Sequence, residues 1–63
     1  MNSKPDMDAT EYKSFRERLG LTQAGLALRL GVSRRTIIFR ETGARITEEA
    51  ALAILALSAS APK

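Results

Sequence analysis

The sequence predicts an all-α fold, a small bundle of four helices, with a fifth helix as an open alternative. Apolar residues recur at the three- and four-residue spacing of amphipathic helices, and a residue able to cap a helix N-terminus stands before each of four such stretches. No stretch alternates apolar and polar residues in the period of a half-buried strand. Glycine follows three of the four stretches, as expected where helices end.

The first helix is expected over residues 9–19. Asp8 can accept a hydrogen bond from a backbone N–H of the first turn, and Glu11, three positions later, completes a capping box. Gly20 then ends the helix. The residues predicted to face the core are Tyr12, Phe15 and Leu19.

A second helix is expected between the N-cap Thr22 and Gly31, and a third over residues 34–42 after the N-cap Ser33. Gly25 is anomalous inside the second helix, because an interior glycine costs about 1 kcal/mol relative to alanine. It either permits a close helix approach or is a weak spot. The apolar positions of this region are Ala24, Leu26, Ala27, Leu30, Val32 and Ile37.

The fourth helix is expected to begin after Thr47, with Glu48 and Glu49 in its first turn, and to continue to Leu57. These boundaries predict one domain over residues 8–57. The polar residues 1–7 and the small residues 58–63 are expected to be a disordered and a frayed tail. The predicted inward stripe of the fourth helix is Ala50, Ala53, Ile54 and Leu57.

The composition argues against several classes of protein. The 63 residues contain no cysteine and no histidine, and the acidic residues are dispersed. We therefore expect no enzyme, no metal site and no cofactor. The longest apolar run is too short to cross a bilayer and no targeting segment is evident, which predicts a cytoplasmic protein without membrane contact.

Positive charge is concentrated in the middle of the chain. The whole chain carries +3, but residues 22–47 hold five arginines against the single acid Glu41. The remainder holds five basic and six acidic residues, a net charge of −1. A basic segment in an otherwise balanced chain indicates an anionic partner.

Residues 21–43, LTQAGLALRLGVSRRTIIFRETG, resemble the signature of the phage repressor and Cro type of helix-turn-helix domains, the XRE-like family. The resemblance covers about residues 8–57 and implies a lambda-repressor-like fold. Ala27 and Gly31 are small where the helices would cross and the chain would turn. In this arrangement the first motif helix braces the second, whose first turn enters the DNA major groove.

The resemblance implies a sequence-specific transcriptional regulator, a repressor that binds a short palindromic site in double-stranded DNA as a homodimer. The alternative is an antitoxin-like interaction module that binds a toxin-like partner protein and autoregulates its operon. Fold alone does not decide between them.

The resemblance assigns base contacts to the start of the third helix. Arginine is shaped to grip guanine O6 and N7 together, although Arg34 and Arg35 could instead neutralise phosphates only. Phe39 could pack on a thymine methyl, or lie in a dimer contact or in the core. The expected base-contacting residues are Ser33, Arg34, Arg35, Thr36 and Phe39.

Phosphate contacts are implied around the motif, at Thr22, Gln23, Arg40, Thr42 and Arg45. Gln23 could alternatively be a solvated surface residue. Arg40 departs from the family, which often has an apolar residue there; its stem could pack while its guanidinium reaches a phosphate or an acid. Arg16 and Glu41 match a pair that forms a structural salt bridge in several relatives.

The fourth helix is apolar nearly all round, more than one small core can cover. Leu52 and Leu55 are therefore expected at a two-fold dimer interface that places two recognition helices one DNA turn apart. Scattered exposed leucines are the alternative.

Overall fold

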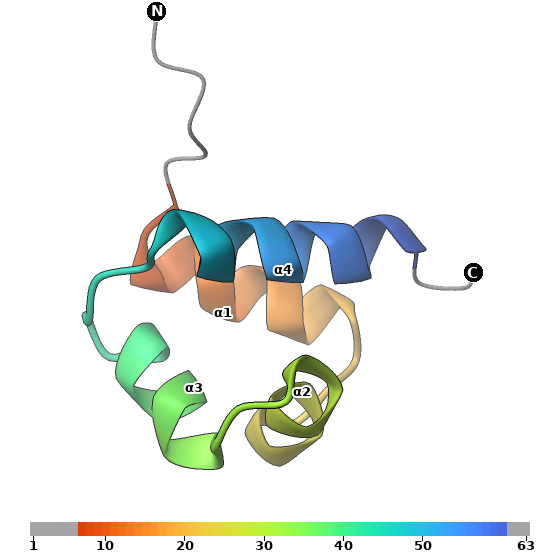
Figure 1. The fold of residues 1–63 in the computed structure, drawn as a ribbon, viewed down its shortest axis with the longest axis horizontal. Coiled ribbons are helices and arrows are strands. Elements are labelled where there is room, and N and C mark those ends of the chain that lie inside the picture. Colours follow the sequence, from red (N-terminus) through yellow and green to blue (C-terminus); the bar gives the residue numbers. More distant parts are fainter. Residues whose placement is uncertain (1–6, 61–63) are drawn as a thin grey trace, which may run out of the picture.

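The computed structural model describes residues 7–60, and these residues form four α-helices without a strand or a fifth helix. This confirms the all-α prediction. The helices are α1 (Ala9–Arg18), α2 (Gln23–Leu30), α3 (Arg34–Glu41) and α4 (Glu48–Ser60). Figure 1 shows α1 and α4 running side by side in the upper part of the view, with α2 and α3 below them.

Side-chain caps begin the helices at the residues that the sequence indicated. Asp8 and Glu11 form a complete capping box, with Asp8 Oδ1 accepting from the Glu11 N–H at 2.9 Å. Thr22 and Ser33 each accept a backbone N–H three residues ahead, at 2.9 and 3.2 Å. Thr47 Oγ1 accepts from the Ala50 N–H at 3.1 Å. Each cap satisfies a donor that the helix itself leaves unpaired.

The turn between α2 and α3 depends on Gly31. Its φ of +72° is left-handed, and a Cβ at this position would meet no heavy atom within 4 Å. Backbone conformation rather than space therefore favours glycine here. The Val32 N–H then donates to the Ala27 carbonyl at 3.0 Å and closes the end of α2.

The nearest atoms around Gly25 do not come from another helix, so the expected close helix approach is absent there. A Cβ there would lie 3.2 Å from Thr22 Oγ1 and 3.7 Å from Leu21 Cδ2, so the crowding atoms belong to the helix's own cap and linker. The absent side chain leaves room for the Thr22 hydroxyl on the first turn of α2.

The core takes one large, fully buried side chain from each helix: Tyr12, Leu26, Ile37 and Ile54. Ala27 completes this cluster, and the side chains packed against it include Phe15, Leu19, Leu30, Val32 and Leu57. Burial of such large side chains supplies the main favourable free energy of folding.

Two details of α4 correct the sequence-based expectation. Ala53 is exposed, while Ala51 is buried with Ala50 and Ile54. A helical face centred on Ile54 includes positions three and four residues back, whereas the adjacent position is rotated by about 100°.

The helix also continues three residues past Leu57, to Ser60, whose hydroxyl donates to the Ala56 carbonyl at 3.1 Å. Residues 58–60 are therefore helical rather than frayed, because no glycine or proline interrupts them. Met7, expected in the N-terminal tail, packs against the core. Residues 1–6 and 61–63 lie outside the described residues.

The other predicted ends agree to within one residue. α1 and α3 end at Arg18 and Glu41, with Leu19 and Thr42 as their C-caps. None of the helices in residues 7–60 has the length and apolar character needed to cross a membrane.

Leu26 and Leu28 lie on the same helix and provide a matched test of this core. Leu26 is fully buried, whereas Leu28 is 84% exposed. We expect Leu26→Ala to lower the free energy of unfolding by about 2–5 kcal/mol, and Leu28→Ala to change it by less than about 0.5 kcal/mol. Urea titration followed by the helical circular dichroism signal measures both values. Equal losses would contradict the assigned core.

Candidate nucleic-acid interface

Arg34 and Arg35 occupy the first turn of α3 and are both exposed. Neither side chain makes an ion pair or hydrogen bond within residues 7–60, so both guanidinium groups are available to a partner. The cap that starts this turn uses the neighbouring hydroxyl groups. Ser33 Oγ and Thr36 Oγ1 lie 2.9 Å apart, and Ser33 Oγ also accepts from the Thr36 N–H.

Phe39 lies further along α3, and 56% of its surface is exposed. This excludes the alternative in which the Phe39 ring fills the core. Ile37 is the residue of α3 that lies in the core. Thus an aromatic surface and two guanidinium groups are accessible on the same helix.

The start of α2 carries the two polar residues expected at phosphates. The Thr22 hydroxyl accepts from the Gly25 N–H and keeps its own proton available for donation. Gln23 is half-buried, and its Nε2 donates to Glu41 Oε1 at 3.1 Å. Gln23 is therefore held by the protein rather than freely solvated.

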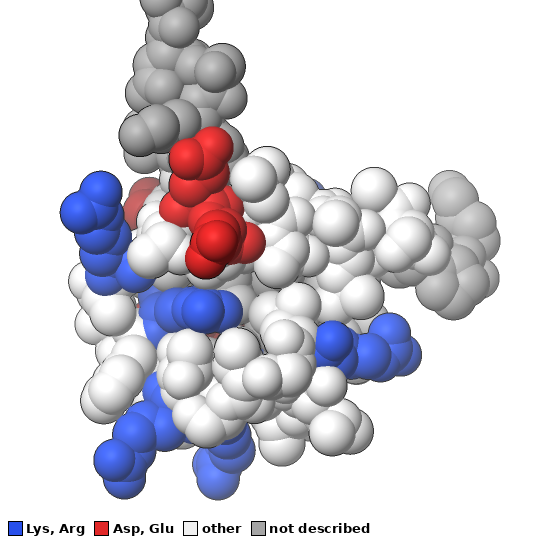
Figure 2. All heavy atoms as spheres, viewed as in Figure 1, with Lys and Arg blue, Asp and Glu red and all other residues white. Residues whose placement is uncertain are grey.

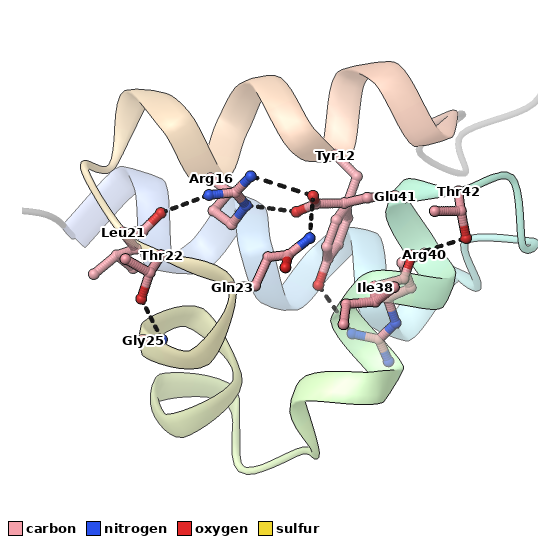
Figure 3. Close-up of polar contacts among 10 residues, drawn as sticks. All are labelled: Tyr12, Arg16, Leu21, Thr22, Gln23, Gly25, Ile38, Arg40, Glu41 and Thr42. Carbon is pink, nitrogen blue, oxygen red and sulfur yellow. Dashed lines mark hydrogen bonds and ion pairs between the residues drawn. The ribbon is translucent and has the colours of Figure 1, made fainter.

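Arg16 and Glu41 form the ion pair at the centre of this region, as Figure 3 shows. Arg16 Nε lies 2.5 Å from Glu41 Oε2, and Nη2 lies 3.2 Å from Oε1. Arg16 Nη1 also donates to the Leu21 carbonyl at 2.8 Å. Only 13% of the Arg16 side chain and 4% of the Glu41 side chain are exposed. The hydrogen bond to Glu41 raises the pKa of Arg16, so the arginine stays charged.

Arg40 contacts a hydroxyl group rather than the acid that was one of its two expected partners. Its Nη1 donates to the Tyr12 hydroxyl at 2.9 Å (Figure 3), which ties α3 to α1. A guanidinium has five N–H groups, so this bond leaves donors for a phosphate.

Thr42 is the expected phosphate contact that the geometry does not favour. Its hydroxyl donates to the carbonyls of Ile38 and Phe39, and its N–H donates to Phe39. A phosphate only accepts hydrogen bonds, and both donors of Thr42 are already used in ending α3. Arg45, in the following loop, is exposed.

Charge is distributed unevenly over the molecule. In Figure 2 acidic atoms gather at the top of the view, near the start of α4, while Lys and Arg atoms lie mostly on the lower part and the flanks. Asp8 and Glu11 at α1 and Glu48 and Glu49 at α4 supply acids to helix starts. The only acid on α2 or α3, Glu41, is paired with Arg16. The α2–α3 side is therefore the more attractive one for a polyanion.

Among residues 7–60, three large apolar side chains are strongly exposed: Leu28, Phe39 and Leu52. Leu52 matches the expected dimer face of α4, whereas its companion Leu55 is only half-exposed. The sequence pattern missed Leu28. Its signal was present, since a residue two positions from both Leu26 and Leu30 must point away from their face.

A family model described as Helix-turn-helix matches residues 13–57, most of the chain. No match was found among the curated proteins or among the solved structures.

Breaking the central ion pair is expected to cost more than removing a surface acid. Glu41→Ala leaves the partly buried Arg16 guanidinium without its main acceptor, and we expect a loss of about 3 kcal/mol in the free energy of unfolding. Glu49→Ala, at an exposed position, should cost less than about 1 kcal/mol. Chemical denaturation of both variants checks this. A Glu41→Ala variant as stable as Glu49→Ala would show that the pair contributes nothing.

Proposed function

The chain belongs to the XRE-like helix-turn-helix family of DNA-binding regulators, and we propose that it is a repressor that reads a specific operator by inserting α3 into the major groove. The observation that carries this proposal is the pair of exposed arginines on the first turn of α3, whose side chains make no ion pair or hydrogen bond within residues 7–60. An α-helix fits the major groove, where guanine presents two acceptors to a guanidinium.

Base reading is assigned to the accessible side chains of α3. Arg34 and Arg35 supply the hydrogen-bond donors, and Phe39 supplies an apolar surface for a thymine methyl. Ser33 and Thr36 share one hydrogen bond, so only one of their two hydroxyl protons is available to a base. We therefore assign them a secondary role.

Backbone contacts are assigned to residues that flank the recognition helix. Thr22 and Gln23 stand at the N-terminus of α2, whose free N–H groups and dipole attract a phosphate. Arg40 keeps free donors beside Tyr12, and Arg45 projects from the loop after α3. Such contacts orient the protein without reading sequence.

A homodimer completes the proposal. Leu52 exposes half of its surface, and Ala53 and Ala56 beside it are small and exposed, so a second α4 could approach closely. A two-fold axis would present two copies of α3 to the halves of a palindromic site. Leu55, half-exposed, would lie at the edge of this contact.

Selection of bound sites from a random DNA pool tests the function as a whole. An enriched palindrome is the expected result. The absence of any enriched sequence would contradict operator recognition and favour the antitoxin-like module that binds a partner protein.

The arginines should separate into two classes on the enriched duplex. We expect Arg34→Ala and Arg35→Ala to weaken specific binding by about tenfold or more, with much smaller losses on a scrambled duplex. Arg45→Ala should weaken binding to both duplexes equally. It should also reduce the slope of log K, the binding constant, against log salt concentration by about 1. Fluorescence anisotropy over a salt series gives these values. Identical behaviour of all three variants would contradict the assignment of base readers.

The dimer is tested with two exposed leucines. We expect sedimentation velocity to show dimers of the natural chain at micromolar concentration and monomers of Leu52→Glu, because a carboxylate would be buried in the contact. Leu28→Glu places the same charge on α2 and should leave the dimer intact. A natural chain that sediments as a monomer would remove this part of the proposal.

A further inference from the structure

Glu41 lies at the meeting point of three segments. Its carboxylate accepts from Arg16 on α1 through both oxygens and from the amide of Gln23, the first residue of α2. Glu41 itself is the last residue of α3. Figure 3 shows these side chains converging, with the Gln23 carbonyl oxygen turned away from Glu41.

The chemistry of the carboxylate determines the orientation of the Gln23 amide. An ionised carboxylate has no proton to donate, so the amide must present its nitrogen to Glu41 Oε1. One Nε2 hydrogen is used in this bond, and the second remains. A phosphate is also only an acceptor, and it would be repelled by the amide oxygen.

We propose that Glu41 is a positioning residue for DNA binding, which holds Gln23 so that the second Nε2 hydrogen, rather than the carbonyl oxygen, meets a backbone phosphate. This inference rests on the function proposed above. In this arrangement the Gln23 amide nitrogen bridges the end of α3 and the DNA backbone. The position of Gln23 relative to α3 is therefore fixed before DNA binds.

Arg16 makes this arrangement compatible with a polyanion. Glu41 alone would add a negative charge near the phosphate, but the guanidinium lies against both of its oxygens. Glu41 thus orients Gln23 while its charge is balanced, and the nearly complete burial of its side chain keeps water from replacing the amide.

Glu41→Gln tests the orientation with little change of shape. A glutamine at this position carries one oxygen and one NH2 group, and it can turn either of them towards Gln23. The variant therefore no longer imposes one orientation on the Gln23 amide, because the amide finds a partner with its nitrogen or with its oxygen. The substitution keeps the shape of the site but removes the constraint that fixes the Gln23 nitrogen.

A double-mutant cycle on the enriched duplex measures the coupling. In the natural background we expect Gln23→Ala to weaken binding about fivefold, and in the Glu41→Gln background by less than about twofold. Arg34→Ala is the control, and its loss should be the same in both backgrounds because Arg34 lies at the other end of α3. Thermal unfolding of every variant sets a temperature at which all are folded.

The outcomes separate the inference from the function on which it rests. Equal Gln23→Ala losses in both backgrounds would overturn the positioning role alone. Reduced losses for both Gln23→Ala and Arg34→Ala would also overturn it, since they indicate a general displacement of α3. A natural chain that binds no DNA would overturn the proposed function and the inference together.

Nuclear magnetic resonance of the natural chain gives a readout that does not depend on the folding of any variant. One of the two Nε2 hydrogens of Gln23 should resonate outside the usual range of glutamine side chains in the free protein, because it is displaced by the Glu41 carboxylate. Addition of the duplex should shift the other. If neither resonance moves on DNA binding, the proposed bridge is absent.

Discussion

The ion pair between Arg16 and Glu41 is the interaction on which the geometry of the interface depends. Through one guanidinium and one carboxylate it joins α1, the carbonyl of Leu21 before α2, the first residue of α2 and the last residue of α3. Four large buried side chains hold the helices together, but apolar contact has no direction. Hydrogen bonds to a partly buried charge are directional, and they set how α3 lies against its neighbours.

The candidate interface contains side chains that are held by hydrogen bonds inside the protein and side chains that are free. Gln23 and Arg40 each make a hydrogen bond inside the protein, to Glu41 and Tyr12, and are therefore placed before a partner arrives. Arg34 and Arg35 are exposed and can adapt to a base pair. In the proposed function, the held side chains contact the DNA backbone on any duplex, and the free arginines discriminate between sequences.

Sequence-based predictions succeeded where the signal is local. Asp8, Thr22, Ser33 and Thr47 cap the helices as expected, because a side-chain acceptor serves an N–H only three residues ahead. They were wrong at one position of the α4 stripe, where the helix is apolar nearly all round. The choice between Ala51 and Ala53 for the core then depends on the rotation of α4 against α1, which the sequence of α4 does not encode.

The sequence by itself determined the all-helical fold, the helix starts, the position of α3 and the excess of positive charge around it. These features depend on residues close together in the chain. Only the tertiary structure decided that Gln23 is held by Glu41, that Arg40 meets Tyr12, and that Phe39 lies outside the core. Residues 18 and 28 positions apart make these two hydrogen bonds, and such contacts exist only once the core has brought the helices together.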